Sequence, residues 1–198
     1  MKDTGKQARG IATKMALLEA AGRVFSRMTY DKAKLKDISD EAGISLGSLY
    51  FHFGNKDDIA EAVLQTQRDR LSGIALEAVE GNGTGRVRLF QLFEGYAEVI
   101  SVDTIVQAGI LLVSSLPDEL KSWGQGFHSE WEQLCLSLIK EGVADGSITS
   151  SWSTEDLCEL LNELFAGAQT ISGVKDGWAS FPKRIQRAKP LYDLLLTS

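Results

Sequence analysis

Apolar residues in this chain recur at steps of three and four, the spacing that gathers them on one face of an α-helix. In the first such segment the repeat begins at Ile11 and runs through Met15, Leu18 and Phe25. The segments that carry the pattern are 9–28, 35–42, 45–53, 55–76, 87–102, 105–116, 123–143, 154–172 and 181–196. Residues 105–113 also have the composition of a strand, but they lie among helices, so we interpret them as a buried helix. No stretch alternates apolar and polar residues convincingly, and the sequence therefore predicts an all-α protein.

Glycines and small polar residues mark the boundaries between the early helices. Gly43 follows the second segment, where a helix end favours a left-handed residue. Ser45 can cap the third segment, and Asn55 can cap the fourth, whose first turn is acidic. Farther along, the glycine-rich run at 81–85 interrupts the periodicity and predicts a loop.

The charge of the chain is divided unevenly between its two parts. The net charge is −6 overall, yet residues 1–56 contain ten Lys or Arg and six Asp or Glu, a balance of +4, and residues 57–198 have a balance of −10. A basic segment in an acidic protein is consistent with contact to nucleic acid, although this balance alone does not establish it. We expect a DNA-binding domain over residues 1–56 and a second domain over residues 57–198.

Other features of the composition narrow the class of protein. The two cysteines, Cys135 and Cys158, form neither a disulfide framework nor a zinc-binding spacing. The first residues have no apolar run behind them, so no signal peptide is expected, and no apolar stretch approaches the roughly 20 residues that span a bilayer. We expect a cytoplasmic protein with no membrane partner, no metal and no cofactor.

Residues 35–56 have the organisation of a helix-turn-helix, two short helices joined by a tight turn that contains glycine. Its inner packing positions are predicted to be Leu35, Ile38, Ala42, Ile44, Leu49 and Phe53. Its outward positions on the second helix are then Ser45, Leu46, Gly47, Ser48, Tyr50, Phe51 and His52. These residues are mostly small or able to form hydrogen bonds, which suits a helix that enters the major groove. Lys36 and Lys56 flank this helix and can neutralise phosphates.

The same stretch resembles the DNA-binding domain of TetR-type repressors. The residues that carry the resemblance are Ile38, Ala42, Gly43, Tyr50, Phe51, His52, Phe53 and Lys56, within a match over residues 9–65. Two positions depart from the family pattern: Ser39 replaces the usual alanine, and Lys34 replaces the usual Thr or Ser cap of the second helix.

The resemblance implies a role for each matching residue. Base edges would be approached by Ser45, Leu46 and Gly47. Phosphates would be held by Lys36, Ser48, Tyr50, His52 and Lys56, and by Thr13 and Lys14 near the start of the first helix. No Arg, Asn or Gln faces the groove, so part of the specificity is expected to come from DNA shape.

The second domain combines apolar helices with scattered polar residues. This composition suits a mostly apolar ligand cavity, and it equally suits a packed core, so the residues leave both interpretations open. The candidate ligand-binding residues are Tyr96, Gln107, Ile110, Leu111, Ser114, Trp131, Phe165 and Gln169.

Residues 50–53, the block 165–172 and Trp131 resemble the γ-butyrolactone receptor branch of the TetR family. This resemblance implies a lactone-like effector that stacks on Trp131 and accepts hydrogen bonds from Gln107 or Gln169. It also implies that the last two helices pair with a second copy in a homodimer, which would place the two recognition helices about 34 Å apart on DNA. The resemblance therefore implies a repressor that binds operator DNA. Binding of the effector would shift the helix at 55–76 and release the repressor from the DNA.

Three alternatives were weighed against this function. The run Gly43–Gly47 matches the G-x-S-x-G pattern of a hydrolase, but a helix precedes it where the motif requires a strand, so we do not expect an enzyme. The pair His128 and Glu132 has helical spacing but lacks a third metal ligand, and we interpret it as a solvated face. The remaining alternative is a TetR-type regulator that responds to another metabolite or drug, or to no ligand.

Overall fold

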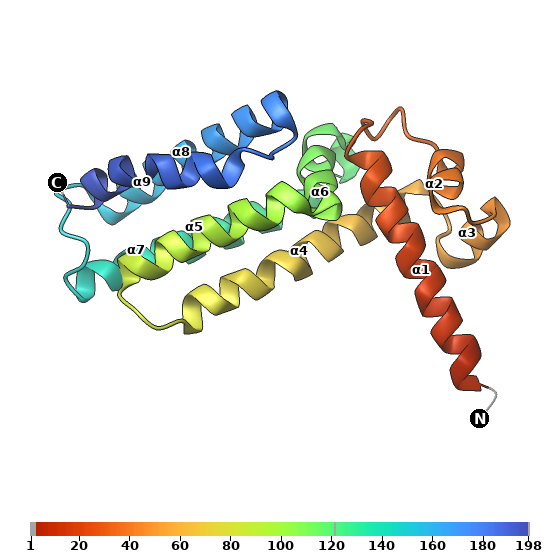
Figure 1. Ribbon diagram of the computed structural model, residues 1–198, viewed down its shortest axis with the longest axis horizontal. Coiled ribbons are helices and arrows are strands. Elements are labelled where there is room, and N and C mark those ends of the chain that lie inside the picture. Colours follow the sequence, from red (N-terminus) through yellow and green to blue (C-terminus); the bar gives the residue numbers. More distant parts are fainter. Residues whose placement is uncertain (1–2, 121, 198) are drawn as a thin grey trace. The chain divides into compact units, whose positions relative to one another are not determined.

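The computed structural model describes residues 3–120 and 122–197, and within these ranges it contains helices and no strand (Figure 1). The helices are α1 (Asp3–Phe25), α2 (Leu35–Ala42), α3 (Leu46–His52), α4 (Lys56–Glu80), α5 (Gly85–Val102), α6 (Thr104–Ser115), α7 (Ser122–Ala144), α8 (Thr154–Asp176) and α9 (Phe181–Thr197). A short 3₁₀ turn, Asp118–Leu120, follows α6. The predicted all-α class is confirmed.

Several predicted helix ends are displaced. Helix α1 ends at Phe25 rather than at residue 28. Beyond Phe25 the regular series of helical hydrogen bonds breaks, because the amides of Arg27 and Met28 both donate to the Val24 carbonyl. Helix α8 continues to Asp176, where Gly177 adopts a φ of 59° and its amide bonds back to Gly173. The left-handed glycine that terminates α8 therefore lies beyond the predicted end.

The chain divides into two compact units. One contains residues up to Asp69 together with Asp103–Gly124, and the other contains Arg70–Val102 together with Gln125 onward. Helix α4 contributes to both units, and α6 belongs to the unit that holds the N-terminal helices. This division reflects which residues pack together. The functional boundary expected at residue 56 stays a prediction.

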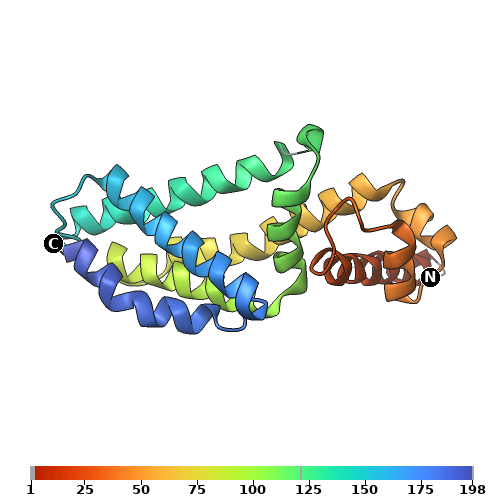
Figure 2. The same ribbon diagram turned by 90° about the horizontal axis from the view of Figure 1, so that it is seen from above.

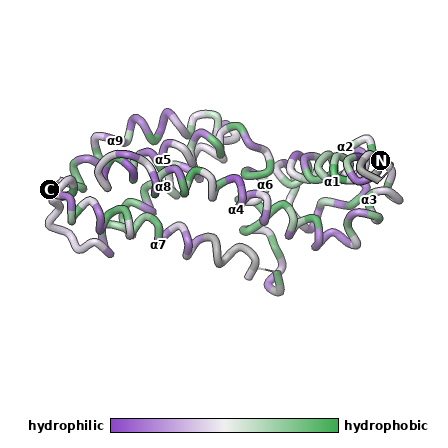
Figure 3. Tube along the Cα trace, turned by 90° about the horizontal axis from the view of Figure 1, so that it is seen from below, coloured by the Kyte–Doolittle hydropathy of each residue, from purple (hydrophilic) through white to green (hydrophobic). Residues whose placement is uncertain are grey.

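The first unit is built around α1, which packs against α2, α3 and α6. Its core is continuous and includes Leu17, Ala21, Val24, Phe25, Ile38, Leu49, Phe53, Ile59, Ile105 and Leu112. Gly22 of α1 lies so close to α6 that a β-carbon there would come within 2.7 Å of Ile105 Cγ1 and 3.2 Å of its Cα. The apolar composition of α6 is visible in Figure 3 and accords with its buried position.

The amino-terminal part of α1 departs from the predicted buried stripe. Ile11 and Met15 are 60% and 45% exposed, and burial begins only at Leu17. The periodicity predicted one buried face along the whole helix, and this was wrong for its first half.

The helix-turn-helix is held by local hydrogen bonds at its turns. Gly43 has a φ of 65°, as its position predicted, and the Ser39 hydroxyl donates to the Ile44 carbonyl at 2.5 Å. Ser45 Oγ accepts from the Ser48 amide at 3.2 Å, which confirms the predicted cap of α3. The side chain of Lys34 does not cap α2. Instead, the backbone amide of Lys34 donates to the Asp37 carboxylate at 2.8 Å. The acid at the third helical position thus provides half of a capping box.

The second unit contains α5, α7, α8 and α9 together with the end of α4, and α9 packs against both α5 and α8 (Figure 2). Ring contacts link α5 to the other helices of this unit. Phe93 lies 5.5 Å from Tyr192 of α9 and 5.2 Å from Phe165 of α8, measured between ring centroids. Cys135 and Cys158 are buried free thiols. No helix in the described part of the chain is by itself long and apolar enough to cross a membrane; only α5 and α6 taken together across their bend meet that test of length and composition.

Candidate functional site

Helix α3 exposes the surface that the sequence predicted for it. Leu49 is its one buried residue. Phe51 is 85% exposed and Tyr50 52%, and Ser45, Leu46 and Gly47 are also exposed, while Ser48 and His52 are partly buried. A β-carbon at Gly47 would meet nothing within 4 Å, so the start of α3 is open for close approach.

The inner positions of the helix-turn-helix are confirmed. Ile38, Leu49 and Phe53 are buried, and Leu35, Ala42 and Ile44 are partly buried against the same core. A shallow groove follows the turn, lined by Lys36, Ser39, Asp40, Gly43, Ile44, Ser45 and Leu46. The turn therefore presents a concave, partly polar edge beside the exposed α3.

The lysines predicted to hold phosphates are in different surroundings. Lys36 is 72% exposed and pairs with Asp40 at 2.8 Å, a surface contact that water screens strongly. Lys14 places its ammonium 5.5 Å from the centre of the Phe53 ring. Thr13 donates its hydroxyl to the Arg9 carbonyl at 2.9 Å within α1. The phosphate-binding roles of these residues stay predictions.

Lys56 is engaged within the protein. Its ammonium donates to the carbonyls of Tyr30 at 2.8 Å and Ala33 at 3.2 Å, and it lies 4.1 Å from the centre of the Tyr30 ring. Tyr30 in turn donates to Asp57, and burial together with this carboxylate raises the pKa of the Tyr30 hydroxyl. The start of α4 is thereby tied to the segment between α1 and α2, a structural role that the sequence did not indicate.

A second polar contact that the sequence analysis missed attaches α2 to α1. Glu41 accepts from Arg23 at 2.7 Å and from Arg27 at 2.6 Å. These hydrogen bonds, first from Arg23 and then from Arg27, lower the pKa of the Glu41 carboxyl. Only the structure reveals the pairing, because Glu41 is on α2 whereas Arg23 is on α1 and Arg27 is in the turn after it.

Three of the predicted effector residues come together in the second unit. The ring of Trp131 lies 4.5 Å from Tyr96 and 5.0 Å from Phe165, and all three side chains are buried. Desolvation raises the pKa of the Tyr96 hydroxyl. Phe93, which the sequence analysis did not select, contacts Trp131 at 5.7 Å. We refer to Phe93, Tyr96, Trp131 and Phe165 as the aromatic cluster.

The other predicted effector residues lie outside this cluster. Gln107, Ile110, Leu111 and Ser114 lie on α6 in the first unit, and Ser114 is exposed and donates to the Leu111 carbonyl at 2.8 Å. Gln169 is partly buried on α8, one turn beyond Phe165. Their contact with an effector stays a prediction.

Asn162 is a polar neighbour of the aromatic cluster that the sequence analysis missed. Its Oδ1 accepts from the indole nitrogen of Trp131 at 2.9 Å. The only sequence signal is its place on α8, three residues before Phe165 and four after Cys158. That spacing indicates a shared helix face but not a partner on α7.

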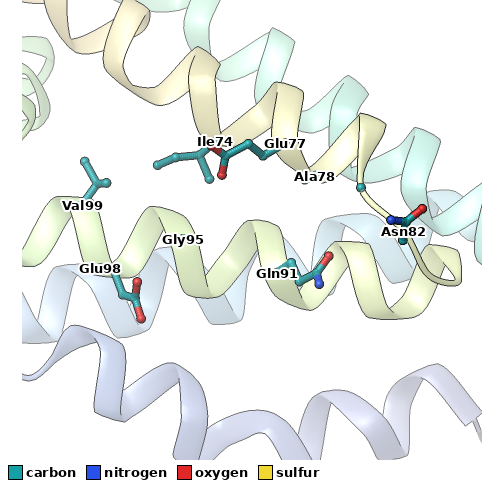
Figure 4. Close-up of a pocket in the computed structure, with 9 residues that line it drawn as sticks. Ile74, Glu77, Ala78, Asn82, Gln91, Gly95, Glu98 and Val99 are labelled. Carbon is teal, nitrogen blue, oxygen red and sulfur yellow. The ribbon is translucent and has the colours of Figure 1, made fainter.

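A separate groove of about 520 Å³ lies between the end of α4 and α5 (Figure 4). Its lining residues are Ile74, Glu77, Ala78, Gly81, Asn82, Gln91, Gly95, Glu98 and Val99. Gly95 permits the close approach of the two helices, because a β-carbon there would lie 2.6 Å from Ile74 Cγ2. By helical spacing Gln91, Gly95 and Glu98 occupy a different face of α5 from Phe93 and Tyr96, so this groove is not the predicted effector site.

Apolar residues are exposed on α8 and α9, the helices predicted to pair with a second copy. Val174 is 85% exposed and Leu194 63%, and Ile171 and Leu191 are about half exposed. Apolar side chains exposed on both helices are compatible with pairing to a second copy, which stays a prediction.

Other candidate chemistries find little support in the described residues. No group of three or more His, Cys, Asp or Glu side chains among them could hold a metal ion. His128 pairs with Glu132 at 3.0 Å, and both side chains are more than half exposed, as predicted for a solvated face. Ser45 lies between two helices rather than after a strand, so the G-x-S-x-G run has the wrong setting for a hydrolase nucleophile.

Comparisons with known proteins agree with this arrangement. The model of the N-terminal region of the tetR family of bacterial regulatory proteins matches residues 17–63. An A-factor receptor protein from Streptomyces griseus is 39% identical over 176 residues, which cover 88% of this chain and 60% of that protein. The HTH-type transcriptional repressor KstR2 from Rhodococcus jostii is 29% identical over 147 residues, covering 70% of this chain and 69% of the repressor.

A solved structure extends the comparison to the whole fold. The crystal structure of a γ-butyrolactone receptor described as ArpA-like matches with a TM-score of 0.71 and 23% identity, over 90% of this chain and 85% of that one. At this identity the likeness concerns the fold.

An exposed second helix on a buried helix-turn-helix core is the arrangement found in DNA-binding domains of this type. Residues 17–63 form an N-terminal domain of the tetR family of bacterial regulatory proteins. The chain spans 60% of the length of the A-factor receptor protein and 69% of the length of KstR2.

Proposed function

We propose that this protein is a homodimeric transcriptional repressor that binds operator DNA through α3 and is released by a small, mostly apolar effector. The observation that carries the proposal is the exposed face of α3, where Leu46, Tyr50 and Phe51 surround an open Gly47. Small residues at the start of a recognition helix allow its backbone to approach base edges, and the hydroxyls near it suit phosphate oxygens.

The proposed effector is a γ-butyrolactone or a molecule of similar polarity. Two observations support this choice, the aromatic cluster around Trp131 and the identity to a protein named as an A-factor receptor. Aromatic faces provide large apolar contact area, and a few polar groups among them can orient a carbonyl or a hydroxyl. A regulator of the same fold that responds to another metabolite, or to none, is the second candidate.

The division of the chain suggests how an effector would act on DNA binding. Gln107, Ile110 and Leu111 lie on α6, which packs on α1 within the DNA-binding unit. An effector that contacts α6 would therefore bear directly on the unit that carries α3. It would shift the equilibrium only as far as its affinities for the DNA-bound and released states differ.

Operator binding is tested by a gel shift at fixed salt on the DNA flanking the protein's own gene. We expect a discrete complex that Tyr50→Ala weakens about tenfold to hundredfold, because a hydrogen bond to a charged phosphate is lost. The same complex then provides the assay for release by a γ-butyrolactone. Failure of the wild type to enrich any sequence from random duplexes would contradict the proposal.

Dimerisation through α8 and α9 predicts that Val174→Asp weakens self-association. Burial of an unpaired carboxylate at an apolar interface is costly, so the dimer dissociation constant should rise at least about tenfold. Sedimentation equilibrium measures this directly. Val102→Asp is the matched control, because Val102 is 79% exposed but lies at the end of α5. Equal effects of both substitutions would argue against this interface.

A further inference from the structure

Asn162 joins α7 and α8 through a closed set of polar contacts. Its Oδ1 accepts from Trp131 Nε1 at 2.9 Å, and its Nδ2 donates to Cys158 Sγ at 3.4 Å. The Cys158 thiol donates to the Glu132 carbonyl, with 3.7 Å between sulfur and oxygen. Because Trp131 and Glu132 are neighbours on α7, the contacts leave α7, pass along α8 and return to α7. The network determines the orientation of the amide, since its oxygen faces the indole donor and its nitrogen faces the sulfur.

The other contacts of the Trp131 ring are less directional. They are aromatic contacts with Tyr96, Phe165 and Phe93, at centroid distances of 4.5, 5.0 and 5.7 Å. Aromatic rings tolerate several tilted arrangements of similar energy, whereas a buried indole N–H requires an acceptor. The hydrogen bond to Asn162 therefore selects one orientation of the indole among those that the aromatic packing allows.

We infer that Asn162 is the positioning residue that holds the Trp131 ring in place to receive the effector. The inference rests on the proposed role of Trp131 in effector binding. A bound lactone would stack on a ring plane that is already fixed, so less conformational freedom is lost on binding. Removing the acceptor frees the ring and weakens effector binding without changing a side chain that contacts DNA.

The test compares Asn162→Leu, which removes the acceptor at similar volume, with Asn162→Asp, which keeps an oxygen for the indole. Asn162→Ala serves as a second acceptor-free variant if leucine prevents folding. Glu159→Gln is the matched control, because Glu159 is exposed on the same helix. The chain has four tryptophans, so the indole N–H signal of Trp131 is assigned by its absence in Trp131→Phe. Two quantities are measured: hydrogen exchange at this indole N–H and affinity for an acyl-substituted γ-butyrolactone.

We expect faster indole exchange and about fivefold to tenfold weaker lactone binding in Asn162→Leu, the loss typical of one hydrogen bond. Asn162→Asp should restore both quantities toward the wild type, and operator affinity should be unchanged in all variants. An indole that stays protected in Asn162→Leu, or unchanged lactone affinity after protection is lost, overturns the inference. If the wild type binds no lactone, the proposed effector is wrong, and the exchange rates alone then support or overturn the positioning of Trp131 by Asn162.

Discussion

Replacing Gly85 with alanine is expected to lower the free energy of unfolding of this protein by about 3 kcal/mol, at the upper end of the cost of overpacking. A β-carbon at Gly85 would lie 2.6 Å from both the Gly142 Cα and the Leu138 carbonyl oxygen. These are backbone atoms of α7, which cannot rotate away as the end of a side chain can. The added methyl group must therefore force the start of α5 away from α7, and this also strains the hydrogen bond from the Gly85 amide to Asp145 at 2.7 Å.

Urea denaturation followed by circular dichroism measures this loss. Gly73→Ala is the matched control, because Gly73 lies within α4 and a β-carbon there meets nothing within 4 Å. Alanine in an open helical position should stabilise the protein by about 0.5–1 kcal/mol. Opposite signs for the two substitutions would support the close contact of α5 and α7, and a stable Gly85→Ala protein would refute it.

Leu49→Ala should abolish operator binding by removing the support of α3. Leu49 is fully buried and is the one buried residue of this helix. Truncation of a buried leucine costs about 2–5 kcal/mol, and here the cavity would lie directly beneath the recognition surface. Thermal denaturation and the gel shift should therefore both change.

Phe51→Ala separates the stability of α3 from its contact with DNA. Phe51 lies two residues away on the same helix but is 85% exposed, so its loss should change stability by less than about 0.5 kcal/mol. Weaker operator binding at unchanged stability would assign this face to DNA. Normal binding by Leu49→Ala would instead show that the packing of α3 does not matter for recognition.

The helix-turn-helix could be predicted in detail because its signals are local. Gly43 ends α2 and Ser45 caps α3, and each does so through backbone atoms within one helical turn of itself. Leu49 and Phe53 are four residues apart, which places both on the buried face. The first half of α1 was mispredicted for a related reason. Periodicity places Ile11 on the same face as Leu18, but it does not tell how far along that face the packing partners extend.

The contacts that complete the candidate sites depend on tertiary structure. Asn162 can accept from Trp131 only when α8 lies beside α7. The spacing of residues within one helix does not predict this contact between two helices. Lys56 was assigned to phosphate by its place in a motif, whereas its surroundings provide two backbone carbonyls. These carbonyls belong to Tyr30 and Ala33, which are distant in sequence, so no local pattern predicts the contacts. The phosphate role of Lys56 stays a prediction.

The division of α4 between the two units has a practical consequence for recombining this protein with others of its fold. The chain passes from one unit to the other at 69/70, 102/103 and 124/125. The unit that contains α3 is therefore not a single stretch of sequence, and an exchange of residues up to Asp69 alone would leave α6 behind. A functional chimera needs three junctions, and the first of them falls inside a continuous helix, where the register of α4 must be kept to the residue.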